Sequence, residues 1–176
     1  MTTKDSVIAE SLQICFKVAR ILKKEFPNQI MKIKDDTIIA FSRKSRLIRR
    51  SSSRGMGGAY AYYTNYSPHR IVIARGTLLD REIASTYGHW VFQKIETKRV
   101  VFEVCPDCKV KFDDEYRVVV VKHRTQLKGN WALCELIMHE LAHHLTKKHQ
   151  KGWQKKYIRF LQFMANQFIS GDFYKN

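Results

Sequence analysis

Three histidines and a glutamate in the C-terminal third have the types and spacing of a catalytic metal site. His139, Glu140 and His143 form an HExxH pattern, and His149 follows six residues after His143. Residues four apart on a helix point to the same side, so the imidazoles of His139 and His143 can bind one ion. Glu140 is turned by about 100° from His139, which lets its carboxylate reach a water molecule without binding the ion. Three protein ligands leave one coordination position open, as in catalytic zinc sites.

The segment that carries these residues has the apolar spacing of a helix. Its apolar residues recur at steps of three and four, at Leu133, Leu136, Ile137, Leu141 and Leu145. Asn130 is the expected N-cap, because its side chain can accept a hydrogen bond from a free backbone N–H. Glu135 lies one turn before His139 on the same face, where it either orients that imidazole or stays solvated. His144 points elsewhere on the helix, and we expect it to be structural or to face solvent.

The position of His149 requires the helix to end before it. A straight helix would carry a third ligand away from the other two. The polar residues 146–148 and Gly152 predict this stop. Downstream of Glu140 the chain holds no glutamate and a single aspartate, Asp172, so His149 is the expected third ligand and Asp172 a weaker substitute. The alternative is a polar helix face without a metal, in which hydrogen bonds satisfy the histidines.

The charge of the chain predicts a polyanionic partner. The chain holds 32 Lys and Arg against 16 Asp and Glu, which gives a formal net charge of +16. Such an excess repels itself and suits a polyanion. Nucleic acid is the first expectation and an anionic membrane surface the second.

Length and apolar content fit one folded domain, 1–176. Apolar residues make up 44% of the chain, which argues against overall disorder. No apolar run approaches the roughly eighteen residues of a membrane span. The start of the chain, residues 1–5, lacks the apolar core of a signal peptide. We therefore expect an intracellular protein, cytoplasmic or in the nucleoid or nucleus.

Basic residues gather in two segments. The first, a serine- and glycine-rich stretch at about 43–58, holds Arg43, Lys44, Arg46, Arg49, Arg50 and Arg54. The second lies around His149 and continues into the last helix, with Lys147, Lys148, Lys151, Lys155 and Lys156. The first segment contains no acid, which favours phosphate contacts by a flexible segment over a plain solvated loop. The second would place a bound polyanion beside the metal site, but a basic helix face is also common as soluble surface.

From His139 onward the chain resembles the SprT-like and WLM (Wss-type) zinc metalloproteases and their YgjP-like relatives. The shared pattern is HExxH, a nearby third histidine and a downstream aromatic residue, here His149 and Trp153. Several members have glycine after the third histidine, where this chain has Gln150. The ligand spacing is also close to the metzincin pattern, but Thr146 stands where that pattern has glycine.

The resemblance has consequences for the fold. Residues 57–60 and 70–73 resemble the glycine-plus-strand segment before the metal helix of SprT-like domains. An α+β, zincin-like fold is implied, in which a small, mostly antiparallel sheet packs on an N-terminal helix and the HExxH helix, with a C-terminal amphipathic helix. The stretch at about 80–130 exceeds what a minimal SprT-like domain needs and is expected to be an insertion. An edge strand of such zincins pairs with the substrate backbone, and residues 70–74 are the candidate.

The resemblance also implies a zinc-dependent endopeptidase that acts on proteins bound to nucleic acid, with DNA favoured over RNA. Zn²⁺ would be held by His139, His143 and His149, and Glu140 would be the general base. Two other functions stay open: a non-catalytic, zinc-stabilised nucleic-acid-binding module and a metal-dependent nuclease. Glu140 argues against the first, because a structural zinc does not need it. Only the resemblance argues against the second.

The remaining elements follow from apolar periodicity and turn residues. We expect helices at 6–26 and 152–169, one or two strands in 30–41, a hairpin of 58–64 with 70–75, and strands around 90–92, 100–104 and 116–122. The expected core residues of the two helices are Ile8, Leu12, Cys15, Ala19, Leu22 and Phe26 in the first, and Trp153, Tyr157, Leu161, Met164 and Phe168 in the last.

Cys105 and Cys108 form a CxxC pattern in a predicted turn between strands. This is half of a zinc ribbon and a possible second metal site, which would need two more ligands. No second CxxC exists, His123 is one candidate helper, and Cys15 and Cys134 fall on predicted helices. A plain hairpin turn with two thiols or a redox pair are the alternatives.

Overall fold

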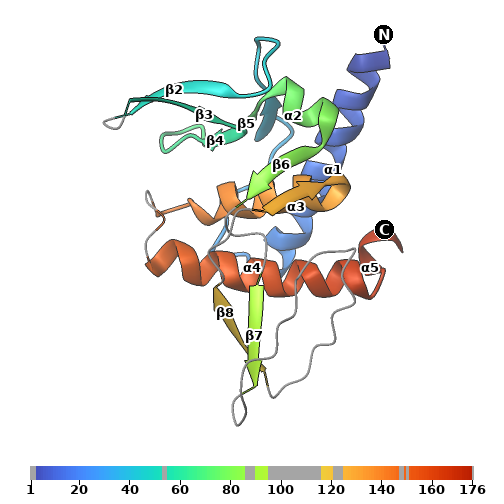
Figure 1. Ribbon diagram of the computed structural model, residues 1–176, viewed down its shortest axis with the longest axis vertical. Coiled ribbons are helices and arrows are strands. Elements are labelled where there is room, and N and C mark those ends of the chain that lie inside the picture. Colours follow the sequence, from blue (N-terminus) through green and yellow to red (C-terminus); the bar gives the residue numbers. More distant parts are fainter. Residues whose placement is uncertain are drawn as a thin grey trace.

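The chain forms an α+β structure with small sheets (Figure 1). This computed structural model describes residues 3–52, 55–85, 90–94, 116–120, 125–146, 149 and 151–175. Its helices are α1 (Thr3–Glu25), α2 (Arg75–Asp80), α3 (Gly129–Ala142), α4 (Lys151–Ile169) and α5 (Asp172–Lys175). Its strands are β1 (Ile38–Ala40), β2 (Ile48–Ser52), β3 (Gly55–Ala59), β4 (Ala61–Tyr63), β5 (Ile71–Ile73), β6 (Glu82–Ser85), β7 (Trp90–Lys94), β8 (Tyr116–Val120) and β9 (Thr125–Lys128).

Strand pairing is mostly antiparallel, as predicted. The three-stranded sheet has the order β1-β5-β4, and β5 pairs parallel with β1 and antiparallel with β4. The other pairs, β2–β3, β6–β9 and β7–β8, are all antiparallel. The predicted hairpin is therefore present as β4 and β5, whereas residues 55–59 belong to a separate strand pair with β2.

The prediction that residues 70–74 form the sheet edge is wrong. Strand β5 lies between β1 and β4, so both of its hydrogen-bonding edges are occupied. All three of its residues, Ile71–Ile73, are buried, as expected for a central strand covered on both faces. Within the described part of the chain, β1 and β4 each pair only with β5, so these two strands, and not β5, have the open edges of the sheet.

Helix α1 confirms the predicted N-terminal helix and most of its apolar stripe. Ile8, Cys15, Ala19 and Leu22 are buried, and Ser11 is buried among them. The Ser11 hydroxyl donates a hydrogen bond to the carbonyl of Leu78 at 2.7 Å and accepts one from Arg81 Nε at 2.8 Å. These bonds satisfy a buried polar group and hold α2 against α1.

Helix α3 lies in the middle of the molecule, packed against α1, α4 and β4 (Figure 1). Nearly all of its residues are buried. The predicted N-cap is wrong, because the helix begins at Gly129 and Lys128 occupies the cap position. Gly129 has a φ of 66°, a backbone conformation that favours glycine, and its N–H donates to the carbonyl of Arg81 at 2.8 Å. This bond starts the helix one residue before Asn130.

Helix α4 confirms the predicted C-terminal helix. The five residues of its expected apolar stripe are all buried, namely Trp153, Tyr157, Leu161, Met164 and Phe168. Phe160 is also buried and contacts Phe26 with a ring-centroid distance of 5.1 Å. Among the helices of the described residues, none is both long enough and apolar enough to cross a bilayer.

The stretch at about 80–130 contains two antiparallel strand pairs. Pair β7–β8 confirms the strands predicted around 90–92 and 116–122, and β6–β9 was not predicted. The strand expected at 100–104, together with Cys105, Cys108 and His123, lies outside the described residues. Cys15 and Cys134 are buried in the core, and burial raises the pKa of the Cys15 thiol to about 12.

The basic segment at about 43–58 contains regular backbone pairing that the sequence did not predict. Strand β2 pairs with β3, with Ile48 opposite Ala59. Such pairing uses main-chain hydrogen bonds, which serine, arginine and glycine can form as well as apolar residues do. Preceding β2, the backbone carbonyl of Ser45 accepts a hydrogen bond from Gly76 N–H at 2.9 Å, and the backbone carbonyl of Arg46 accepts one from the Thr77 hydroxyl at 3.0 Å. These bonds fix the start of the segment on α2.

The close approach of this segment to α2 requires glycine at position 76. A Cβ on Gly76 would lie 2.6 Å from the Cα of Arg46. We expect Gly76→Ala to lower the free energy of unfolding by about 1–3 kcal/mol, because backbone must move to relieve the overlap. Urea denaturation measures this change.

Gly152→Ala is the matched control. A Cβ there meets Thr146 Cγ2 at 3.5 Å, an ordinary contact, and alanine is the better helix former. We expect no loss of stability, and a gain of up to about 1 kcal/mol. Equal stability of the two variants would contradict the assigned contact between Gly76 and residue 46.

Candidate metal centre

His139, His143 and His149 converge at one end of α3. One ring nitrogen from each lies within 4.8 Å of those of the other two. The Nε2 atoms of His139 and His149 are 2.8 Å apart. The two predicted helix ligands and the predicted third ligand are therefore brought together, and Asp172, the weaker substitute, lies on α5.

A chain reversal after α3 brings His149 back to the helix. Helix α3 ends at Ala142, with His143 at the C-cap. The N–H of Thr146 donates to the carbonyl of His143 at 2.9 Å, and Leu145 adopts a left-handed φ of 64°. Leu145 is 80% exposed, so it does not continue the apolar stripe predicted for the helix. The predicted end of the helix before His149 is confirmed.

Hydrogen bonding orients the second ligand. His143 Nδ1 lies 3.1 Å from the carbonyl oxygen of Thr146, which can only accept. The proton of a neutral His143 ring is therefore on Nδ1, which leaves the Nε2 lone pair for a metal. The same turn that redirects the chain thus also sets the tautomer of a ligand.

Burial favours the metal-binding form of the three imidazoles. It lowers the pKa of His139 well below its usual value and lowers those of His143 and His149. For His139 and His143, the neighbouring imidazoles add to this effect. Neutral imidazoles are the form that binds metals, so the cluster is ready for an ion at neutral pH.

Trp153 packs against the histidine cluster from α4. Its indole N–H donates to the carbonyl of His139 at 3.1 Å. Its ring centroid lies 4.8 Å from that of His139 and 4.6 Å from that of His149. The aromatic residue downstream of the third histidine therefore holds α4 on the end of α3 and forms one wall of the cluster.

Glu135 lies behind His139 in the core. Glu135 is 2% exposed, which rules out the solvated role considered from the sequence. Its Oε1 accepts a hydrogen bond from the Tyr157 hydroxyl at 2.9 Å and lies 3.9 Å from His139 Nδ1. The carboxylate thus faces the ring nitrogen remote from Nε2, but 3.9 Å is too long for a hydrogen bond, so its influence on the imidazole is electrostatic.

Glu140 and the edge strand β4 border the same pocket. This pocket has a volume of about 330 Å³. Beside the three histidines and Glu140, it is lined by Ala59, Ala61, Tyr62, Tyr63 and Asn65. Glu140 is 6% exposed. The predicted base, the predicted ligands and strand β4 therefore meet around one space.

The three donors fit a zinc ion. Nitrogens bound to tetrahedral zinc at about 2.0–2.1 Å lie roughly 3.4 Å apart. The observed separations of 2.8 Å and up to 4.8 Å bracket that value, so small rotations of the rings suffice. Three neutral imidazoles without a bound carboxylate also suit zinc better than magnesium or calcium, which take oxygen ligands.

A second polar cluster adjoins the pocket. The hydroxyl of Tyr63 and Nδ1 of His144 are 2.9 Å apart, and the ring of Tyr63 stacks on that of His69 with centroids 5.5 Å apart. Burial raises the pKa of Tyr63 to about 12 and lowers that of His144. His144 therefore joins the turn after α3 to β4, which agrees with the structural role expected for it, although it lies in the turn and not on the helix.

The basic residues around the site differ in their surroundings. Lys156 is half-buried, and its ammonium donates to the carbonyl of His144 at the end of α3. Burial lowers its pKa, so Lys156 supports the fold beside the site. Lys155 is exposed. Lys151 lies at the start of α4, and Lys147 and Lys148 are outside the described residues.

The basic segment lies between β1 and β4 in the chain, and it contributes most of the β2–β3 strand pair. Arg43, Lys44, Arg46 and Arg49 are exposed. Arg46 lies 3.9 Å from Glu82, a weak ion pair at the surface. Arg50 lies on β2, and Arg54 is outside the described residues.

Comparison of the chain with models of protein families, with curated proteins and with solved structures found no match. The site is therefore defined by its own geometry. Sequence reasoning missed two contributors to it. One is Tyr157, whose position one turn after Trp153 on the same helix face was a usable signal. The other is the carbonyl of Thr146, for which residue type gives no signal.

Replacing Glu135 tests its contact with the first ligand. We expect Glu135→Gln to weaken zinc binding by about 10–100-fold, because the charge behind His139 is removed while the volume is kept. Competition with a chromophoric chelator measures the affinity. Glu25→Gln, at the exposed end of α1, is the matched control. A folded Glu135→Gln protein with unchanged affinity would show that the carboxylate does not influence the ligand.

Proposed function

We propose that the chain is a zinc-dependent endopeptidase of the zincin type that acts on proteins bound to nucleic acid. The observation that carries the proposal is the pocket in which Glu140 meets His139, His143 and His149 beside the open edge of β4. A structural zinc needs neither a carboxylate at the ion nor an adjoining pocket. The resemblance to SprT-like and WLM metalloproteases agrees with this arrangement.

The zinc ion, when bound, would lower the pKa of a water molecule and polarise the scissile carbonyl. Glu140 would be the proton acceptor for the attacking water and would return the proton to the leaving amine. The Thr146 carbonyl orients His143, and the charge of Glu135 lies behind His139, so both contacts would favour imidazoles that are ready for the ion before substrate arrives.

The open edge of β4 is the proposed docking site for the substrate backbone. Ala61–Tyr63 line the pocket and pair on one side only within the described residues. An extended peptide that added a strand there would pass along the histidines with its carbonyls near the ion site. This assigns to β4 the role that the sequence analysis gave to residues 70–74.

The nucleic-acid part of the proposal is based on charge. The formal net charge of +16 and the exposed Arg43, Lys44 and Arg49 suit a phosphate backbone. DNA is preferred over RNA on the resemblance alone. Such a substrate would place the protein in the cytoplasm, or in the nucleoid or nucleus.

Glu140→Gln tests the role of the carboxylate in cleavage separately from metal binding. We expect the variant to keep zinc and to lose between about 10²- and 10⁴-fold of the cleavage rate, because the proton acceptor is gone. Cleavage of a DNA-bound protein, with and without DNA, is followed on gels together with the zinc content. Glu25→Gln should cleave like the wild type.

Other outcomes would replace the proposal. Zinc-loaded wild type that cleaves neither itself nor DNA-bound proteins would contradict a peptidase. Degradation of nucleic acid with proteins spared would assign a nuclease. A chain that chelation unfolds, and in which Glu140→Gln changes no activity, would be a zinc-stabilised binding module.

A further inference from the structure

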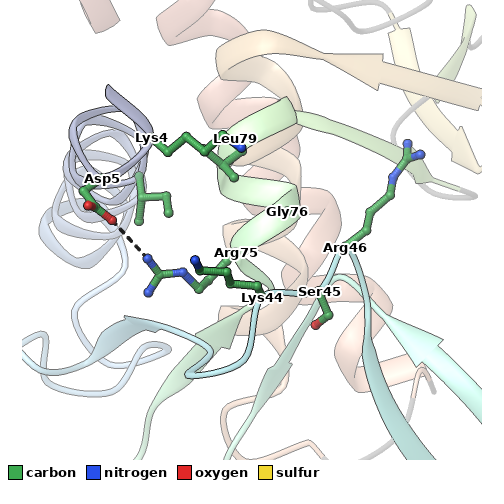
Figure 2. A pocket seen from close by; sticks show the side chains of 9 residues that line it. Lys4, Asp5, Lys44, Ser45, Arg46, Arg75, Gly76 and Leu79 are labelled. Atoms are coloured by element: carbon green, nitrogen blue, oxygen red, sulfur yellow. Dashed lines mark hydrogen bonds and ion pairs between the residues drawn. The ribbon is translucent and has the colours of Figure 1, made fainter. Parts of the chain in front are cut away.

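A second pocket lies between the start of α1, the beginning of the basic segment and α2 (Figure 2). Its volume is about 470 Å³, within the range of roughly 300–1,000 Å³ typical of small-molecule sites. It is lined by Lys4, Asp5, Ile8, Lys44, Ser45, Arg46, Arg75, Gly76 and Leu79. None of these residues lines the metal pocket, so the two pockets are separate.

Positive charge dominates the rim of this pocket. Figure 2 shows Lys44 extending toward Arg75 and Lys4 reaching across toward Leu79, whereas Arg46 points away. Asp5 is the one acid in the lining, and it pairs with Arg75 at 3.2 Å. The side chains of Lys4, Lys44 and Arg75 therefore surround a space that has only one carboxylate in its lining. Their positive charges repel one another, and a bound anion would relieve that repulsion.

The pocket also has an apolar floor. Ile8 is buried on α1, and Leu79 is half-buried on α2. A phosphate group alone would fill only a small part of the space. A ligand with a phosphate and a flat apolar body would match both the charged rim and the floor.

Hydrogen bonds to backbone carbonyls hold one wall of the pocket, residues 45 and 46, in place. The hydrogen bonds of Gly76 to Ser45 and of Thr77 to Arg46 attach residues 45 and 46 to α2. The absence of a side chain at Gly76 allows that close contact. The neighbouring Lys44 is thereby placed opposite α1, and little ordering of the backbone is needed when a ligand binds.

We propose that this pocket binds a nucleoside phosphate, with the phosphate between Lys4, Lys44 and Arg75 and the base against Ile8 and Leu79. The ligand is a free nucleotide or a nucleotide of a nucleic-acid strand, since both present the same phosphate and base. The site is independent of zinc and of peptidase chemistry.

If the ligand is a nucleotide of a nucleic-acid strand, the location of the pocket has a further consequence, which rests on the proposed function. Ile48 pairs with Ala59, which lines the metal pocket. Two Cα steps of 3.8 Å and one cross-strand step of about 5.5 Å put the Cα atoms of Arg46 and Ala59 at most about 13 Å apart. A strand held in the second pocket would therefore present its bound proteins near the peptidase site.

Direct binding measurements test the proposal without any need for peptidase activity. Zinc-loaded full-length protein is titrated calorimetrically with adenosine 5′-monophosphate, adenosine and inorganic phosphate. A fluorescent oligonucleotide with or without a 5′-phosphate is titrated by anisotropy. We expect the monophosphate or the oligonucleotide to bind at least tenfold more tightly than adenosine or inorganic phosphate. Saturation by the free monophosphate identifies a nucleotide site, and saturation by the oligonucleotide alone identifies a strand.

Charge reversal at exposed lysines supplies the variants. The double variant Lys4→Glu with Lys44→Glu should weaken binding at least tenfold. Lys24→Glu with Lys32→Glu makes the same charge change at exposed positions outside the lining and should change affinity less than twofold. Equal losses in both double variants, no saturable binding of either probe, or inorganic phosphate bound as tightly as the monophosphate would each overturn the proposal. Because these experiments measure binding directly, a failure to bind nucleotide would leave the peptidase hypothesis intact. A failure to cleave protein would likewise leave the proposed nucleotide site intact.

Discussion

The candidate site depends on the reversal of the chain between α3 and α4. His139 and His143 are four residues apart on one helix, but His149 can join them only if the helix stops and turns back. Leu145 makes this turn with a φ of 64°, and the Thr146 carbonyl at the turn binds His143 Nδ1. One short segment therefore both delivers the third ligand and orients the second.

The core behind the histidines keeps this geometry rigid. Trp153 joins α4 to the backbone of α3 at His139, and its ring stacks on that of Tyr157 with centroids 4.9 Å apart. Tyr157 in turn binds Glu135, which is buried and faces His139. A buried carboxylate is costly unless it is bonded, so these contacts place charge where it influences a ligand. Packing of α3 on α4 and preparation of the metal site are thus the same set of interactions.

How well a feature can be predicted from the sequence depends on how far apart in the chain the interacting residues lie. The stripe of α4 and the spacing of His139 and His143 are set by helical periodicity, and both predictions were confirmed. The order of strands depends on pairing between distant segments, so β5 was taken for the edge that β4 occupies. The pocket between α1 and α2 joins Lys4 to Arg75, two residues that no local pattern connects. Glu135 could be placed on the right face, but its burial depends on Tyr157 of another helix.

The three-histidine site can be tested directly by the zinc content of the purified protein. Wild type, His149→Ala and His69→Ala are loaded with zinc, dialysed and measured by mass spectrometry of the metal. His69 is a matched control, since it bonds the carbonyl of Thr64 and does not belong to the metal cluster. We expect one zinc ion per chain in wild type and in His69→Ala, and far less in His149→Ala. Equal zinc content in wild type and His149→Ala, or none in either, would contradict the three-histidine site.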